Sequence, residues 1–404
     1  MLKRHSILYL VLYLLCPVAG VAQSIAFHHL TVENGLSQNA VLSVSQDEQG
    51  FIWIGTSNGL NRYDGYRFRI YQSRQNDSTT LTNNNILSIL NDSRNQMWVG
   101  TYFGLNKYDA ALDRFKRIPS PRDHQLSFAS IFEDRSGRLW VGTNEGLYNM
   151  VNDRLVAVDF PKSSGVASDV GVRSIAQDRN GHIWIGTIAG LLQLPNGQTQ
   201  GMKVFRHNPA DAATLSADLI TGIEEDRFGR IWAATLNNGL NMLEPGTDRF
   251  RRFLHISGQP SLINNNVRKI LLDKSGLLWI GTQEGISVLD ENLRVVYSFQ
   301  QKDGDPHSLS HNSVHCLYQD VSGNIWTGTY FGGLNYTYAV NTEFAVLRKK
   351  DAPNFLSNNV ISSITEDEKK NLWIGTEGGG LNYYDRSSGL FTSYKHNPAD
   401  PLSI

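Results

Sequence analysis

One motif recurs eight times along the chain, and each copy is centred on a tryptophan. An aspartate lies six residues before each tryptophan, and a threonine lies three residues after it. The copies are spaced 42 to 48 residues apart, and they contain all the tryptophans of the chain: Trp53, Trp98, Trp140, Trp184, Trp232, Trp279, Trp326 and Trp373. Repeats of this length with short β-rich segments predict an all-β fold, a β-propeller of four-stranded blades.

The first copy shows how one repeat predicts four strands, termed A to D. Residues 41–44 are β-rich and predict strand A, and the Asp47 turn leads into strand B at residues 51–56. Gly59 opens strand C, and residues 66–70 form a more polar strand D. In the last copy Lys370 replaces the turn glycine, which predicts a strained or altered turn there.

The tryptophans are predicted to pack between blades, because a blade alone cannot bury both of its faces and its neighbours must cover them. Their spacing places them on interior strands, which disfavours a role in stacking ligands.

A ninth D-like strand, residues 25–30, precedes the first full repeat and suggests how the ring closes. In a seven-bladed ring this strand pairs with strand C at residues 333–338. A strand around Phe344 then begins a second propeller, whose first blade carries Trp373. In the competing eight-bladed ring, residues 25–30 pair with residues 381–384 instead.

The N-terminus predicts export. A basic start at Lys3 and Arg4, an apolar stretch and small residues near Ala22 are typical of a signal peptide. We therefore expect residues 1–22 to be a signal peptide, residues 23–340 the first seven-bladed propeller, and residues 341–404 the truncated start of a second. The net charge of −1 gives no support for a nucleic-acid partner. Cys316 is expected to be a buried, inert thiol.

The sequence contains no recognisable catalytic constellation. It lacks the nucleophile-elbow, zincin and phosphate-loop motifs. The Glu225-Asp226 pair belongs to the repeated turn, and His207 and His396 lie in a repeated loop. We expect no catalytic residue, no metal site and no cofactor.

The repeats resemble those of the two-component regulator propeller family. Residues 172–191, with Asp178, Trp184 and Thr187, and residues 359–381, with Trp373, show the family pattern of aspartate, tryptophan, glycine, threonine and Gly-Leu. The resemblance covers essentially the whole mature chain.

Several properties follow from that resemblance alone. It implies the periplasmic sensor region of a hybrid two-component histidine kinase receptor, anchored in the inner membrane and expected to act as a homodimer. Such receptors commonly sense carbohydrates, so the implied ligand is a small molecule or an oligosaccharide. These 404 residues contain no kinase motif, so kinase activity would lie in further sequence.

Candidate ligand-binding residues lie where copies differ, on the propeller face that carries the B–C turns and D–A loops. Aromatic rings at turn tips have little core to fill, which makes them candidates for contact with a ligand. The turn candidates are Tyr102, Phe103, Tyr330 and Phe331, with Glu145, Glu284, Asn237 and Asn238 as hydrogen-bonding groups. Polar outliers at one aligned strand-A position, Arg173, Arg268 and His315, would line the central channel.

Two alternatives stay open at this point. The strand-A outliers could simply be solvated channel walls. The chain could also be a secreted propeller enzyme acting on polysaccharide, a lyase or a glycosidase. Such an enzyme should gather histidine, tyrosine, arginine or carboxylate side chains at the channel.

Overall fold

Each copy of the repeat forms one four-stranded antiparallel sheet in the computed structural model, which describes residues 25–338, 347–349 and 354–404. The predicted signal peptide and the predicted strand around Phe344 lie outside the described residues.

The blades follow the chain in the order A, B, C, D. The first four are β2(Val41–Gln46), β3(Ile52–Thr56), β4(Gly59–Tyr63) and β5(Phe68–Tyr71); β6(Ile86–Asn91), β7(Met97–Thr101), β8(Gly104–Asp109) and β9(Arg114–Ile118); β10(Phe128–Glu133), β11(Leu139–Thr143), β12(Gly146–Val151) and β13(Arg154–Ala157); β14(Val172–Gln177), β15(Ile183–Thr187), β16(Gly190–Leu194) and β17(Lys203–Phe205). Blades 5 and 6 are β18(Ile220–Glu225), β19(Ile231–Thr235), β20(Leu240–Leu243) and β21(Phe250–Phe253); β22(Val267–Leu272), β23(Leu278–Thr282), β24(Gly285–Leu289) and β25(Val295–Phe299).

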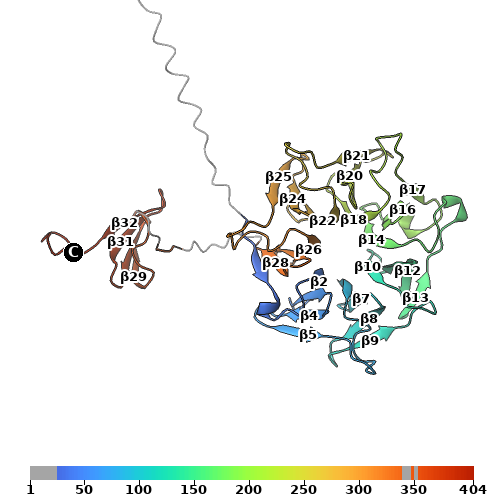
Figure 1. The fold of residues 1–404 in the computed structure, drawn as a ribbon, viewed down its shortest axis with the longest axis horizontal. Coiled ribbons are helices and arrows are strands. Elements are labelled where there is room, and N and C mark those ends of the chain that lie inside the picture. The colour runs from blue at the N-terminus through green and yellow to red at the C-terminus, as the bar shows by residue number, and fades with distance from the viewer. Residues whose placement is uncertain (1–24, 339–346, 350–353) are drawn as a thin grey trace, which may run out of the picture. The chain divides into compact units, whose positions relative to one another are not determined.

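Blade 7 is assembled from both ends of the ring. It contains β26(Val314–Gln319), β27(Ile325–Thr329), β28(Leu334–Thr337) and, as its outer strand, β1(His28–Leu30). β1 runs antiparallel to β28, with His28 opposite Tyr336 and Leu30 opposite Leu334. The predicted pairing of residues 25–30 with residues 333–338 is therefore confirmed, and the ring has seven blades (Figure 1).

The eighth sheet is β29(Ile361–Glu366), β30(Leu372–Thr376), β31(Gly380–Asp385) and β32(Leu390–Tyr394). It belongs to a second compact unit, which divides from the ring between residues 339 and 340. Three short 3-10 helices, η1(Val32–Asn34), η2(Lys162–Ser164) and η3(Pro195–Gly197), complete the described elements. No helix among them is long and apolar enough to cross a membrane.

The repeated aspartate organises the turn between strands A and B. In blade 1 the Asp47 Oδ1 accepts the Phe51 backbone N–H at 2.9 Å, and Oδ2 accepts the Trp53 indole N–H at 2.7 Å. The same tryptophan–aspartate bond is present in all seven ring blades. In the eighth blade Lys370 adopts a φ of +69° at the turn position normally held by glycine, so the predicted strained turn is present.

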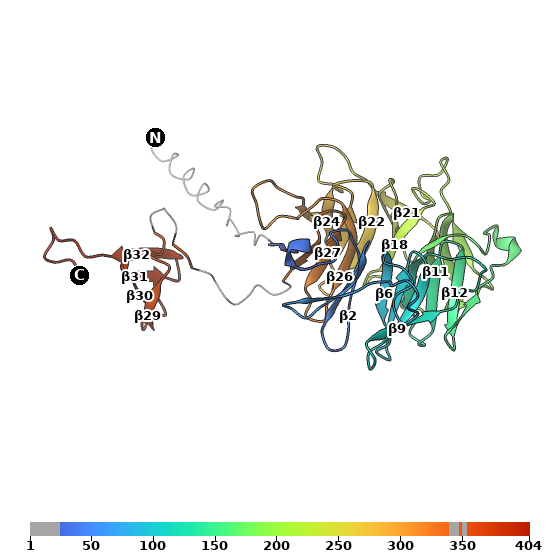
Figure 2. The ribbon, with the colours of Figure 1, turned by 60° about the horizontal axis from the view of Figure 1, so that its bottom comes forward.

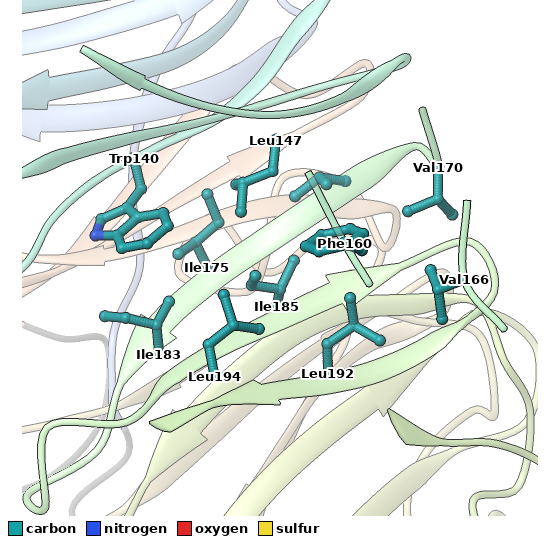
Figure 3. Close-up of a cluster of buried hydrophobic side chains, with 11 residues drawn as sticks. Trp140, Leu147, Phe160, Val166, Val170, Ile175, Ile183, Ile185, Leu192 and Leu194 are labelled. Carbon is teal, nitrogen blue, oxygen red and sulfur yellow. The ribbon is translucent and has the colours of Figure 1, made fainter. Parts of the chain in front are cut away.

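The tryptophans pack between blades, as predicted. Figure 3 shows Trp140 of β11 against Ile175, Ile183 and Leu194, which all belong to the next blade. Trp326 of blade 7 lies in a cluster with Val41 and Ile54 of blade 1, so the same packing also closes the ring. Burial of these faces accounts for near-continuous apolar strands such as β3, β11 and β15.

A polar link also joins neighbouring blades at the A–B turns. The residue after one repeated aspartate donates its backbone N–H to the side chain before the next aspartate. Five of the seven junctions have this bond: Ser93 to Glu133, Arg135 to Gln177, Arg179 to Glu225, Lys274 to Gln319, and Val321 to Gln46. The last of these, at 2.9 Å, joins blade 7 to blade 1.

The A strands line the centre of the ring. In Figure 1, β2, β10, β14, β18, β22 and β26 lie towards the centre, and β5, β9, β13, β17, β21 and β25 lie at the outer rim. Neighbouring A strands such as β18 and β22 run side by side along the wall (Figure 2).

Every A strand has a β-bulge at its second residue. In β22 the register against β23 shifts between Val267 and Lys269, which leaves Arg268 as the extra residue. His315 in β26 and Arg173 in β14 occupy the same place. Because a bulge re-aims its side chain and interrupts the ladder, the aligned polar outliers are all bulge residues.

Candidate ligand-binding site

A pocket of about 470 Å³ opens at the junction of blades 6 and 7, among B–C turns and D–A loops. It contains five of the residues that the sequence predicted for ligand binding: Arg268, Glu284, His315, Tyr330 and Phe331. Gln283, Gln301, His311, Asn312 and Ser313 complete its wall.

The D–A loop that carries His311 and Ser313 is anchored to the body of blade 7. Leu309 is fully buried, and the Ser310 backbone N–H donates to Asn335 Oδ1 at 2.8 Å. The Tyr330 N–H donates to the Ser313 carbonyl at 3.0 Å, which joins the loop to the B–C turn. The pocket is therefore held by a firmly attached loop and turn.

Aromatic and imidazole rings form one wall of the pocket. His315 stacks on Tyr330, with 5.1 Å between ring centroids and 25° between planes. Phe331 meets Tyr330 edge-on at 4.4 Å and His311 at 5.4 Å. Tyr330 and Phe331 remain 41% and 65% exposed, so their rings are available to a ligand.

Arg268 crosses from blade 6 to blade 7 and binds two groups of the pocket. Its Nη1 donates to Ser313 Oγ and to His315 Nε2. Since a guanidinium has no acceptor, His315 Nε2 must be unprotonated and the proton of the neutral ring must sit on Nδ1.

The surroundings of the two side chains keep His315 neutral beside the charged Arg268. Burial, followed by the positive charge of Arg268 and then His311, lowers the pKa of His315 to about 4 from its ordinary value of 6.5. Burial also lowers the pKa of Arg268, although the guanidinium stays charged. Around neutral pH the pocket therefore holds the charged guanidinium of Arg268 and a neutral His315.

The other predicted turn residues lie elsewhere on the ring. Tyr102 and Phe103 contact each other at 4.7 Å, and no ring of this pair contacts Tyr330 or Phe331 within the described residues. Glu145 Oε2 is 2.9 Å from His124 Nε2. Asn237 and Asn238 are exposed at the turn of blade 5. The structure thus does not gather these five residues with the pocket.

Arg173 also stands apart from the pocket, although it shares the bulge position of Arg268. Its side chain is exposed on blade 4.

Sequence reasoning missed His311 and Ser313. A signal was present, since His311 follows Leu309-Ser310 where other copies carry Gln38, Asn83 or Asn358 after the same Leu-Ser or Leu-Thr step. A histidine at that step was a departure from the repeat, in the same way as the strand-A outliers.

A second cavity, of about 510 Å³, lies between blades 4 and 5 near the A–B turns. Four of its charged side chains form two ion pairs: Arg179 with Glu225 at 2.7 Å and Lys203 with Asp248 at 2.8 Å. Its remaining wall includes the repeat residues Asp178 and Trp184. Because these groups already satisfy each other, this cavity is a weaker candidate. Among the described residues, no cluster of three or more histidine, cysteine or acidic side chains is arranged to hold a metal ion.

The closed ring and its repeat define a seven-bladed repeat propeller with an open pocket on one face. Seven segments match the family described as two component regulator propeller: residues 35–58, 80–103, 124–145, 167–189, 261–284, 308–331 and 356–378. The chain belongs to this family. Each segment runs from a D–A loop to a B–C turn, and the fifth repeat, which has Ala234 in place of the strand-B glycine, is not among them.

Two relatives carry the same association with two-component signalling. The extracellular domain of a hybrid two component system from B. thetaiotaomicron is 28% identical with a TM-score of 0.67, over 92% of this chain and 49% of that one. Histidine kinase P4 of Formosa agariphila is 43% identical over 56 residues, which are 14% of this chain and 4% of the kinase. The chain thus spans about half of the first relative and matches a small part of the second.

An enzyme shares the fold at lower similarity. Virginiamycin B lyase from Staphylococcus aureus has a TM-score of 0.59 and 12% identity, over 78% of this chain and 100% of that one. At this identity the likeness shows the propeller fold alone.

Proposed function

We propose that this chain is the ligand-sensing, periplasmic part of a hybrid two-component receptor and that its ligand is an oligosaccharide. The family and the similarity to an extracellular domain of such a system support the receptor assignment. The exported N-terminus expected from the sequence agrees with it. The family resemblance further suggests a homodimer anchored in the inner membrane by sequence outside this chain.

The observation that carries the ligand class is the exposed aromatic wall of the pocket at blades 6 and 7. A sugar ring has an apolar face that stacks on an aromatic ring, while its hydroxyl groups need hydrogen-bonding partners. Tyr330 supplies the ring, and Arg268, Glu284 and Gln301 supply polar groups around it.

A lyase or glycosidase is the second candidate, and the pocket favours it less. A general base must be free to accept a proton near neutral pH. His315 Nε2 already accepts from Arg268, and its pKa of about 4 makes it a weak base. Glu284 is exposed at the rim of the pocket. We therefore propose that this region binds without turnover.

The test is calorimetric titration of the chain with a panel of oligosaccharides. Tyr330→Ala should weaken binding by about tenfold or more, because loss of a stacking ring removes on the order of 1–2 kcal/mol. Tyr66→Ala is the matched control, since Tyr66 is 92% exposed on a C–D turn, at the opposite end of the strands. Equal affinities of the wild type and Tyr330→Ala would place the sugar elsewhere, with Tyr102 the next variant to examine.

A further inference from the structure

The pocket between blades 6 and 7 is rich in hydrogen-bond donors. Arg268 Nη1 uses Ser313 Oγ and His315 Nε2 as acceptors. Each of these groups therefore keeps its own proton for another partner, on the Ser313 hydroxyl and on His315 Nδ1. The guanidinium has further N–H groups on Nη2 and Nε.

His311 adds a donor in the same way. Its Nδ1 accepts the Ser313 backbone N–H at 3.0 Å, so the proton of its neutral ring is on Nε2. The loop that carries both residues thus contributes two donors to one side of the pocket.

The guanidinium of Arg268 has no carboxylate partner. Within the part of the chain that the structure describes, no acidic oxygen lies within 4.0 Å of it. Two other partly buried cations of the ring do have one: Arg230 lies 2.5 Å from Asp226, and Lys107 lies 3.2 Å from Asp153. The acidic residue of the pocket, Glu284, is exposed at its rim. A half-buried cation without a counter-charge is unfavourable, and an anion entering the pocket would relieve it.

We propose that this pocket binds an anionic oxygen group of the ligand, a carboxylate or a sulfate, and that Arg268 is its partner. Such a group only accepts hydrogen bonds, so it matches the donors of Arg268, Ser313, His311 and His315. The planar guanidinium can hold it through two parallel bonds. Tyr330, stacked beside His315, then faces the ring that carries the anion.

The inference rests on the proposed function for the sugar, whereas the anion site itself can be tested with simple ions. The chain is titrated with acetate and with sulfate at constant ionic strength, with chloride as the balancing salt. Nuclear magnetic resonance follows the imidazole signals of His311 and His315. A saturable shift of these signals is expected with at least one of the two ions. The ion that binds more tightly shows whether the site prefers a carboxylate or a sulfate.

Two variants decide whether Arg268 is responsible. Arg268→Gln should abolish the saturable shift, and Arg268→Lys, which keeps the charge without the fork, should weaken it several-fold. Arg173→Gln is the matched control, because it changes the same bulge position on blade 4 and should leave the titration unchanged. The inference is overturned if neither ion gives a saturable shift, or if Arg268→Gln and Arg268→Lys both titrate like the wild type.

A comparison of oligosaccharides then tests whether the anion is part of the sugar ligand. Uronate and sulfated oligosaccharides are compared with neutral counterparts, made by reducing the carboxyl group or removing the sulfate. The acidic form should bind about tenfold more tightly or better, and Arg268→Gln should remove that difference. Equal binding of both forms would overturn the anion site and leave the proposed function standing. If simple anions bind but none of the oligosaccharides does, the anion site stands and the proposed function is overturned.

Discussion

The first blade of the ring and the eighth blade have the same motif and the same strand register but opposite burial. Val41 pairs with Thr56 in β2–β3, and Ile361 pairs with Thr376 in β29–β30. Val41 and Val44 are 0% and 8% exposed, whereas their counterparts Ile361 and Ile364 are 40% and 60% exposed.

The difference separates what a repeat does by itself from what it does with a neighbour. The ladder and the turn form locally, and Asp367 Oδ1 still accepts the Asn371 N–H at 2.9 Å. The hydrogen-bonded strand ladder alone does not bury the side chains of the blade. Trp373 is only partly buried and, among the described residues, makes no bond to Asp367, unlike Trp53 with Asp47. A blade is thus folded by its own turns and stabilised by the blade beside it.

The largest expected contrast is between two tryptophans. Trp184→Ala should lower the free energy of unfolding of the ring by about 3–5 kcal/mol, because it empties a buried inter-blade site. Trp373→Ala should affect the unfolding of the eighth blade much less, since its ring is not enclosed. Urea unfolding followed by hydrogen exchange of each unit measures both. Similar losses in the two units would contradict the contrast.

A smaller contrast is expected at the glycine of strand B. A Cβ at Gly186 would overlap Ser174 Oγ and Ile220 Cγ2 of the next blade, so Gly186→Ala should cost about 1–3 kcal/mol. At Gly375 the nearest atoms are serine atoms of its own blade, Ser363 and Ser362. Ser363→Gly should therefore rescue Gly375→Ala almost fully.

Blade 5 already contains this exchange, with Gly222 opposite Ala234. Ser174→Gly should rescue Gly186→Ala only in part, because the overlap with Ile220 remains. Thermal unfolding of the single and double variants measures the coupling, and full rescue in blade 4 would show that Ile220 moves aside.

The inter-blade hydrogen bonds give a contrast of about 1 kcal/mol. Gln46→Ala removes the acceptor of the Val321 N–H at the closure of the ring and should cost about that much. Its counterpart in the eighth blade, Glu366, forms exposed ion pairs with Lys370 and Arg386. Glu366→Ala should cost less than about 0.5 kcal/mol by urea unfolding. An equal cost at both positions would mean that the bond to Val321 contributes nothing.

The last contrast appears only in acid. His315 in the folded ring has a pKa of about 4, against 6.5 for an ordinary histidine. Between these values the unfolded state binds a proton that the folded state does not, so stability should fall as pH decreases from about 6.5 towards 4. The fall should be shallower in His315→Gln, whereas Ser362 at the same bulge of the eighth blade gives no such dependence. Parallel pH profiles of the wild type and His315→Gln would show that His315 is not responsible.

The repeat made most of the fold predictable from the sequence. The eight regularly spaced copies predicted the four strands of each blade. The extra strand before Leu36 predicted how the ring closes, and the pairing of β1 with β28 confirms it. The bonds between blades were not foreseen, because the Gln46 acceptor and its Val321 donor lie far apart in the chain and neither stands out by type.

The site was predicted in part. Departures from the repeat identified Arg268, His315, Tyr330 and Phe331, which the pocket unites. The same criterion selected Tyr102 and Arg173, which lie elsewhere, because spacing does not tell which blades meet at one pocket. The pairing of Arg268 with His315 depends on two neighbouring bulges, and bulges leave no clear mark in sequence.

The outer strand of blade 7 also sets an order of events during synthesis. His28 emerges about three hundred residues before its partner Tyr336, so the seventh blade cannot be completed until nearly the whole ring has been made. Joining such distant segments is a slow, non-local step, even though its entropic cost grows by only about 0.6 kcal/mol for each doubling of the loop. Until then Phe27 and Leu30, which are buried in the finished ring, would be exposed to water. A nascent chain therefore carries two uncovered apolar side chains that a chaperone could hold, and their release would coincide with the completion of the ring.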